Sequence, residues 1–155
     1  MQDEFNPDLF VAKWYCSLLY PEEMPQFAAD SLEAGYDGPA LRRLAGMVKP
    51  TSTDIGDFFS QSLTEIGTVT VQNAEQAAIV LARMTARDII EGRIDPLKGA
   101  RFLAGLASSR NYPAYLVPFY QLAELPYWGE YAPPRAKLIE DIFTEARLLI
   151  ASVAG

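Results

Sequence analysis

Aromatic residues gather between Tyr112 and Pro134, and their types and spacing indicate binding more clearly than any other part of this sequence. Tyrosine and tryptophan on loops are typical anchors of protein interfaces, because they bury a large area at a small cost in conformational entropy. The alternative is structural, since aromatic rings also fix irregular loops onto a helical core. The residues predicted to form an interaction surface are Tyr112, Tyr115, Tyr127, Trp128 and Tyr131.

Four arginines are candidates for contacts to an anion or to nucleic acid. Arg83 and Arg87 are four residues apart, so a helix would present them on one face. Arg42 and Arg43 lie on a predicted short helix that follows another helix and Gly35, an order typical of the helix-turn-helix. Acidic residues flank this segment, and solvated faces with ordinary ion pairs would explain the arginines equally well. Nucleic acid binding is therefore an alternative function and not the leading one.

The sequence contains no histidine and a single cysteine, Cys16. Histidine is the commonest general base and the commonest transition-metal ligand. Its absence excludes Ser-His-Asp and Cys-His catalysis, zinc sites of Cys and His, and di-iron sites of Glu-x-x-His motifs within this chain. No phosphate-binding glycine loop or EF-hand pattern is present either. We expect no cofactor, no metal and no catalytic residue.

Composition and charge indicate a globular protein with an acidic surface. Hydrophobic residues make up 50% of the 155 residues, and 20 acidic against 13 basic residues give a formal net charge of −7. This charge repels the phosphate backbone of nucleic acids and favours a basic protein partner. No apolar run approaches the roughly 20 residues that cross a bilayer. The acidic start, Met1–Glu4, lacks the basic region of a signal peptide. We therefore expect a cytoplasmic protein without membrane association.

Prolines, glycines and capping residues predict about seven to eight short helices. Asn6-Pro7 and Asp95-Pro96 each place a polar residue before a proline, which favours the first turn of a helix. Asn73 and Gln76 have the spacing of a capping box, and Thr53 is the expected cap of another helix. Glycines mark the positions where several of the helical patterns stop.

Two further segments have a clear pattern. The last helix is predicted from an apolar face at helical spacing that includes Leu138, Ile142, Leu149 and Val153. Residues 68–71 alone alternate as a strand would, but no pairing partner is evident. We predict that they form an extended linker.

Together these patterns predict an all-α protein, folded as a compact antiparallel bundle or array of helices. No linker is long enough to divide the chain, so we expect residues 1–155 to form a single domain. The leading interpretation of function is an acidic helical module for protein–protein interaction. An adaptor fits this interpretation, as does a bacterial-type immunity or antitoxin protein that neutralises a basic toxin by charge complementarity.

Three alternatives stay open at this point. The aromatic surface could pair with a second copy of the chain as a homodimer. The chain could be a helix-turn-helix regulator that binds nucleic acid. It could also be an enzyme or small-ligand binder with a pocket between helices.

Overall fold

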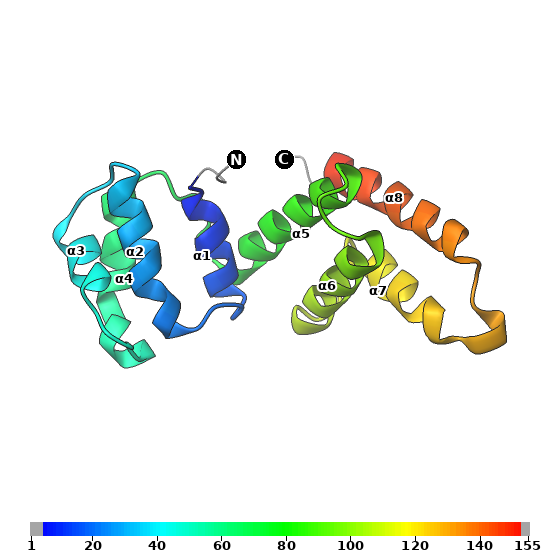
Figure 1. Cartoon of the computed structure of the whole chain (residues 1–155), viewed down its shortest axis with the longest axis horizontal. Coiled ribbons are helices and arrows are strands. Elements are labelled where there is room, and N and C mark those ends of the chain that lie inside the picture. Colours follow the sequence, from blue (N-terminus) through cyan, green and yellow to red (C-terminus); the bar gives the residue numbers. More distant parts are fainter. Residues whose placement is uncertain (1–4, 153–155) are drawn as a thin grey trace. The chain divides into compact units, whose positions relative to one another are not determined.

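The structure is a computed structural model of the chain, and it describes residues 5–152 (Figure 1). The described residues form eight α-helices and three short 3-10 helices, with no strand among them. The predicted all-α fold is therefore confirmed. By their contacts the residues divide into two compact units, Met1–Ala77 (unit 1) and Ala78–Gly155 (unit 2). The single domain stays a prediction.

Unit 1 contains four helices of its own and the first residues of a fifth. The elements are α1 (Pro7–Tyr15), the 3-10 helix η1 (Pro21–Glu23), α2 (Met24–Glu33), α3 (Pro39–Ala45) and α4 (Ser52–Ile66). Within the unit, α2 packs against α3 and α4, and α3 packs against α4. Aromatic rings join α1 to this group. The ring of Phe10 stacks on that of Phe27 with 3.9 Å between centroids, and the ring of Trp14 lies 5.5 Å from that of Phe59.

Unit 2 contains the greater part of α5 and three further helices. The elements are α5 (Ala74–Ile90), α6 (Pro96–Ser109), α7 (Val117–Glu124), the 3-10 helices η2 (Leu125–Tyr127) and η3 (Gly129–Tyr131), and α8 (Arg135–Ser152). Within the unit, α6 packs against α7 and α8, and α7 packs against α8. The backbone of α6 also approaches α5 closely, since a Cβ added at Gly99 would lie 2.6 Å from the Ile89 side chain.

The polar caps at the starts of α1, α5 and α6 are confirmed. Asn6 and Asp95 each accept a hydrogen bond from the backbone amide three residues further on. Asn73 accepts one from the Gln76 amide at 2.8 Å, but the Gln76 side chain accepts from the Gln72 amide. The predicted capping box therefore forms with its second hydrogen bond moved by one residue.

The predicted cap at Thr53 is wrong, because α4 begins at Ser52 and is capped by Thr51. The Thr51 hydroxyl accepts from the Asp54 amide at 3.2 Å, and the Asp54 carboxylate accepts from the Thr51 amide at 2.8 Å. The hydrogen bonds from Thr51 hold the pKa of Asp54 below its usual range. A capping box needs an acid or amide three residues after the cap, and Thr53 has Gly56 at that position.

The extended linker is confirmed, since residues 67–72 contain neither helix nor strand. The carboxylate of Asp8, in the first turn of α1, accepts hydrogen bonds from the amide and the hydroxyl of Thr70. These two hydrogen bonds fasten the linker to the start of α1 and satisfy an amide that no ladder pairs.

The apolar face of α8 is also confirmed. Leu138, Ile142 and Leu149 are buried against the rest of unit 2. Val153, the fourth predicted member of the face, lies outside the described residues, and so does Met1–Glu4. In the part of the chain that the structure describes, no helix is both long enough and apolar enough to cross a membrane.

Candidate functional site

Three of the predicted aromatic residues lie on the turns that follow α7, and all three are exposed to solvent. The exposed fraction is 75% for Tyr127, 55% for Trp128 and 78% for Tyr131. Pro126 lies at the start of η2, and Gly129 has a φ of 62° where η3 begins. Proline cannot continue the hydrogen bonding of α7, and glycine adopts positive φ at little cost, so the chain makes two tight turns here.

Tyr112 lies in the loop between α6 and α7, where the backbone is strained. Asn111 and Tyr112 have φ values of 61° and 55°, which is uncommon for residues other than glycine. The Tyr112 amide donates to the Ala107 carbonyl at 2.7 Å. Its ring meets the Tyr120 ring edge-on, with 5.1 Å between centroids. This turn therefore fixes the Tyr112 ring beside α7.

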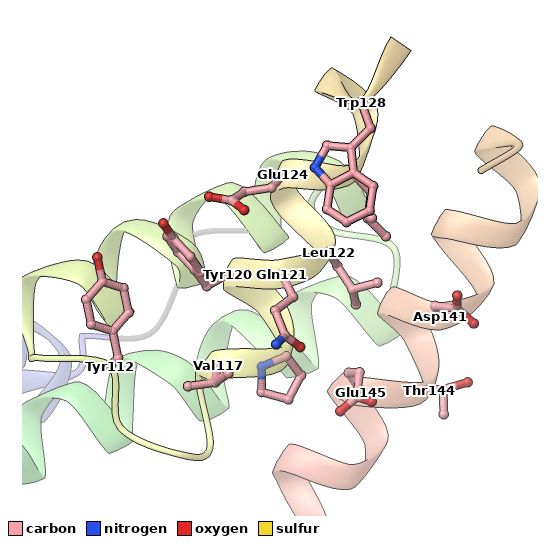
Figure 2. A pocket seen from close by; sticks show the side chains of 12 residues that line it. Tyr112, Val117, Tyr120, Gln121, Leu122, Glu124, Trp128, Asp141, Thr144 and Glu145 are labelled. Carbon is pink, nitrogen blue, oxygen red and sulfur yellow. The ribbon is translucent and has the colours of Figure 1, made fainter. Parts of the chain in front are cut away.

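An open groove with a volume of about 840 Å³ lies between α7 and α8 (Figure 2). We call it the α7–α8 groove. Tyr112, Leu122 and Trp128 contribute apolar surface on the side of α7, and one face of α8 forms the opposite wall. The structure thus brings two predicted site residues, Tyr112 and Trp128, into one groove, and Tyr127 and Tyr131 lie on the adjoining turns.

Carboxylates lie on both walls of the α7–α8 groove. Glu124 comes from α7, and Asp141 and Glu145 come from α8. Asp141 forms an ion pair with Lys137 at 3.0 Å. Glu124 and Glu145 form no ion pair within residues 5–152. The groove therefore combines apolar surface with uncompensated negative charge, a combination that suits a lysine or arginine side chain.

The phenol of Tyr120 interacts with the carboxylate of Glu124. A hydrogen bond to Glu124 and the negative charge of that residue raise the pKa of Tyr120 to about 12. Both effects favour the protonated phenol, because ionising it would place a second negative charge beside the first. The Tyr120 phenol therefore stays protonated at neutral pH.

The remaining predicted aromatic residue, Tyr115, is half-buried and is not among the residues that line the groove. Although Tyr120 belongs to the aromatic stretch between Tyr112 and Pro134, the site residues predicted from the sequence did not include Tyr120 and Glu124. Their i, i+4 spacing on one helix was available as a signal. What the sequence lacked was any sign that this face of α7 lies opposite Asp141 and Glu145 on α8.

In unit 1 the two candidate arginines are engaged within the unit. The Arg42 guanidinium donates from Nε to Asp37 Oδ1 at 2.9 Å, and this hydrogen bond holds the pKa of the Asp37 carboxyl below its usual range. The Arg43 guanidinium lies 5.6 Å from the centroid of the Phe58 ring. Both arginines nevertheless lie on the exposed surface of α3, so the structure leaves their predicted contact to nucleic acid untested.

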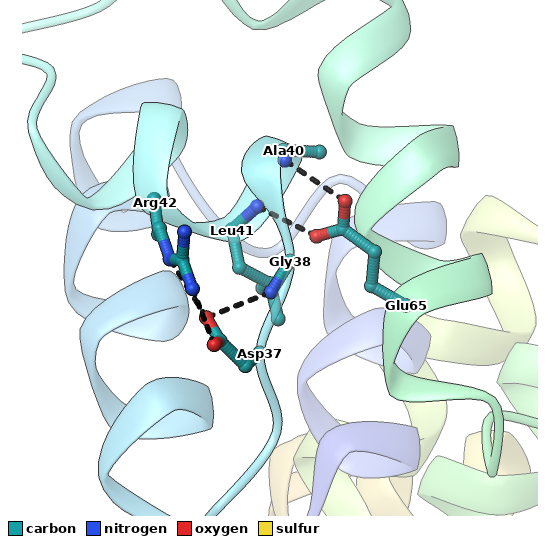
Figure 3. A network of polar contacts seen from close by, with 6 residues as sticks. All are labelled: Asp37, Gly38, Ala40, Leu41, Arg42 and Glu65. Atoms are coloured by element: carbon teal, nitrogen blue, oxygen red, sulfur yellow. Dashed lines mark hydrogen bonds and ion pairs between the residues drawn. The ribbon is translucent and has the colours of Figure 1, made fainter.

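A carboxylate occupies the start of α3, where the backbone amides of a helix could bind an anion (Figure 3). Glu65, from α4, accepts hydrogen bonds from the amides of Ala40 and Leu41 at 2.9 and 2.8 Å. Gly38 leaves room for this contact, because a Cβ at that position would overlap the Glu65 side chain. The amides of Ala40 and Leu41 are therefore already paired with a carboxylate of the same unit.

The other two arginines lie on α5. Arg87 is exposed, whereas Arg83 is half-buried, and within residues 5–152 its Nε has no hydrogen-bond partner. No phosphate-binding loop accompanies them in the sequence. Among the described residues, no group of three or more Cys, Asp or Glu side chains is placed to hold a metal ion.

No protein-family model, no curated protein and no solved structure matches this chain. Its function therefore has to be inferred from the residues and geometry of the site.

Proposed function

We propose that this protein is a protein–protein interaction module that binds a basic segment of another protein in the α7–α8 groove. One observation carries the proposal. Trp128 lies exposed at a groove whose two walls carry the carboxylates of Glu124 and Glu145, and within residues 5–152 no cation is paired to either.

The two kinds of surface in the groove would make different contributions. An apolar side chain of the partner would pack against Tyr112, Leu122 and Trp128, which supplies the affinity that aromatic anchors give to interfaces. A lysine or arginine beside it would pair with Glu124 or Glu145 and lie over the indole ring of Trp128. The segment that fits best therefore alternates apolar and basic residues.

Features of both units favour this proposal over the alternatives. The net charge of −7 and the filled amides of α3 disfavour a nucleic acid partner. The raised pKa of the Tyr120 phenol in the groove disfavours this side chain as a general base. The chain also has no histidine to serve as a base.

A basic partner is consistent with an adaptor and with an immunity or antitoxin protein of bacterial type, where charge complementarity speeds association. A cytoplasmic location belongs to the same proposal and is in keeping with a single cysteine, which forms no disulfide within the chain. A homodimer is the competing occupant of the groove.

The proposal is tested by affinity capture from lysate of the native organism, using the full chain as bait. The baits are the wild type, the double variant Tyr127→Ala, Trp128→Ala, and the control Leu148→Ala, whose side chain is exposed on α8 but does not line the groove. We expect a basic protein to be recovered by wild type and control and lost with the double variant. Identical recovery by all three baits would contradict the proposal, and so would recovery of the chain itself as the sole partner.

A further inference from the structure

Unit 1 has a groove of its own, and none of its lining residues lines the α7–α8 groove of unit 2. It has a volume of about 480 Å³ and lies between α1 and the segment η1–α2. We call it the α1–α2 groove. Its floor is aromatic: Phe10 stacks on Phe27 with planes 8° apart, and Phe5 lies 6.0 Å from Phe27. Leu9 and Leu19 extend this apolar surface.

The rim of this groove is acidic. Glu22, Glu23 and Asp30 line it, and Lys13 is the single basic residue among its lining residues. The Glu23 carboxylate accepts a hydrogen bond from the Tyr20 amide at 2.7 Å, and the Asp30 carboxylate accepts one from the neutral side-chain amide of Gln26 at 2.8 Å. Glu22 and Asp30 form no ion pair within the described chain. Two carboxylates therefore border an apolar floor without a cation of their own.

The acidity of the whole protein is concentrated in this unit. Residues 1–77 hold 12 acidic and four basic residues, and residues 78–155 hold eight and nine. The formal charge is therefore −8 for unit 1 and +1 for unit 2. A field of this kind attracts cationic partners to unit 1 and repels anionic surfaces.

We propose that the α1–α2 groove is a docking site for an amphipathic helix of a partner protein, with apolar residues on one face and lysine or arginine along its edges. The apolar face would cover Leu9, Phe10 and Leu19, which are only half-buried, whereas Phe27 beneath them is already buried, and the basic edge would pair with Glu22 and Asp30. A helix is favoured because unit 1 offers no strand edge among its described residues, so the bound segment must satisfy its own backbone hydrogen bonds. This inference does not depend on the function proposed for the α7–α8 groove.

The test uses the full chain and three labelled synthetic peptides of about 16 residues, which is roughly four helical turns. The first has leucine at helical spacing and lysine elsewhere. The second has the same composition in an order without an apolar face, and the third has glutamate in place of lysine. Fluorescence anisotropy measures binding of each peptide to the wild type and the variants.

Two double variants remove the same amount of charge from unit 1. Glu22→Gln, Asp30→Asn changes the rim of the groove, and Glu33→Gln, Asp57→Asn changes exposed carboxylates that do not line it. Circular dichroism confirms that all variants fold. We expect the first peptide to bind in preference to the other two, the rim variant to weaken it at least about fivefold, and the control variant to change it by less than about twofold.

Several outcomes would overturn the inference. Equal weakening by the two double variants, or equal binding of the scrambled peptide, would show attraction to bulk charge alone. Weakening by Trp128→Ala without an effect of the rim variant would place the peptide in the α7–α8 groove, which supports the proposed function and refutes this second site. A dimer in sedimentation that the rim variant dissociates would assign the groove to a second copy of the chain.

Discussion

Trp128 combines solvent exposure with a place in the groove, and it is the residue on which the proposed function depends most. Tryptophans in such positions commonly contribute about 2 kcal/mol or more to an interface. We expect Trp128→Ala to weaken binding of the captured partner about 30-fold in calorimetric titration, with an unchanged melting temperature. Leu148→Ala, at 56% exposure against 55% for Trp128, should change the affinity by less than about twofold. Equal affinities of the two variants would contradict this prediction.

Glu65 contributes to the stability of unit 1, and this contribution can be measured directly. Its carboxylate accepts from two amides at the start of α3, and its loss leaves both amides without their partner. We expect Glu65→Ala to lower the free energy of unfolding by about 1–2 kcal/mol in urea. Glu33→Ala, which removes an exposed carboxylate without such contacts, should change it by less than about 0.5 kcal/mol. An unchanged free energy of unfolding in Glu65→Ala would contradict the claim that this carboxylate stabilises the start of α3.

Asp54 makes the stability of unit 1 depend on pH. Its pKa is lowered in the folded state, chiefly by the hydrogen bond from the Thr51 amide, so its contribution is complete above the ordinary carboxyl pKa of about 4. This contribution is lost as the pH falls through the lower folded pKa. We therefore expect wild type to lose more stability than Asp54→Asn between about pH 5 and pH 2 in urea unfolding. Parallel curves for the two proteins would exclude the linkage.

At the scale of the element, two glycines of α6 differ in the space around them, so substitution by alanine should change stability in opposite directions. Gly99 has the Ile89 side chain 2.6 Å from the position of an added Cβ, whereas Gly105 has nothing within 4 Å. We expect Gly99→Ala to destabilise the protein by about 1–3 kcal/mol through overpacking. Gly105→Ala should stabilise it by about 0.5–1 kcal/mol, because alanine is the better helix former. Thermal unfolding measures both, and a stabilising Gly99→Ala would contradict the close packing of α5 and α6.

The elements also show what the sequence could predict. Helix starts were predictable where a polar side chain reaches an amide within its own turn, as at Asn6 and Asp95. Local geometry decided these positions, so no knowledge of the tertiary fold was needed. The start of α4 was missed, because two threonines competed and only Thr51 has an acid three residues later.

The site was predictable in part, for a related reason. The aromatic residues stand out as a cluster within one stretch of sequence, so Tyr112 and Trp128 could be named as candidates before the structure placed them at one groove. The opposite wall of the groove comes from α8, and its carboxylates became relevant only once the fold placed α8 against α7. Side chains that meet through tertiary packing leave no local signal at a fixed spacing. The α1–α2 groove was missed for the same reason.

At the scale of the whole molecule, the boundary between the two units falls inside α5, and Ala77 and Ala78 on either side of it are buried. Sequence analysis looks for domain boundaries in exposed, polar linkers, and a boundary within a helix gives no such signal. As no exposed linker separates the units, we expect a single cooperative unfolding transition in calorimetry and hydrogen exchange. Two transitions, with α6–α8 exchanging apart from α2–α4, would contradict the predicted single domain.

The net charge of −7 likewise conceals an uneven distribution, since unit 1 carries −8 and unit 2 carries +1. Overall acidity therefore says little about the α7–α8 groove, where the local pattern of carboxylates matters. A partner bound there should depend on Glu124 and Glu145 more than on the carboxylates of unit 1.

Site-specific photo-cross-linking in native lysate tests the central claim most directly. A benzophenone amino acid replaces Tyr127 beside the α7–α8 groove or, as the control, Leu148 on α8, and mass spectrometry maps the products. We predict that the probe at position 127 cross-links to a lysine- or arginine-rich segment of one protein. The control probe should give no such product, and Glu124→Gln with Glu145→Gln should abolish it. Equal products from both positions, or a product that survives the loss of both carboxylates, would contradict the claim that this groove binds a basic segment.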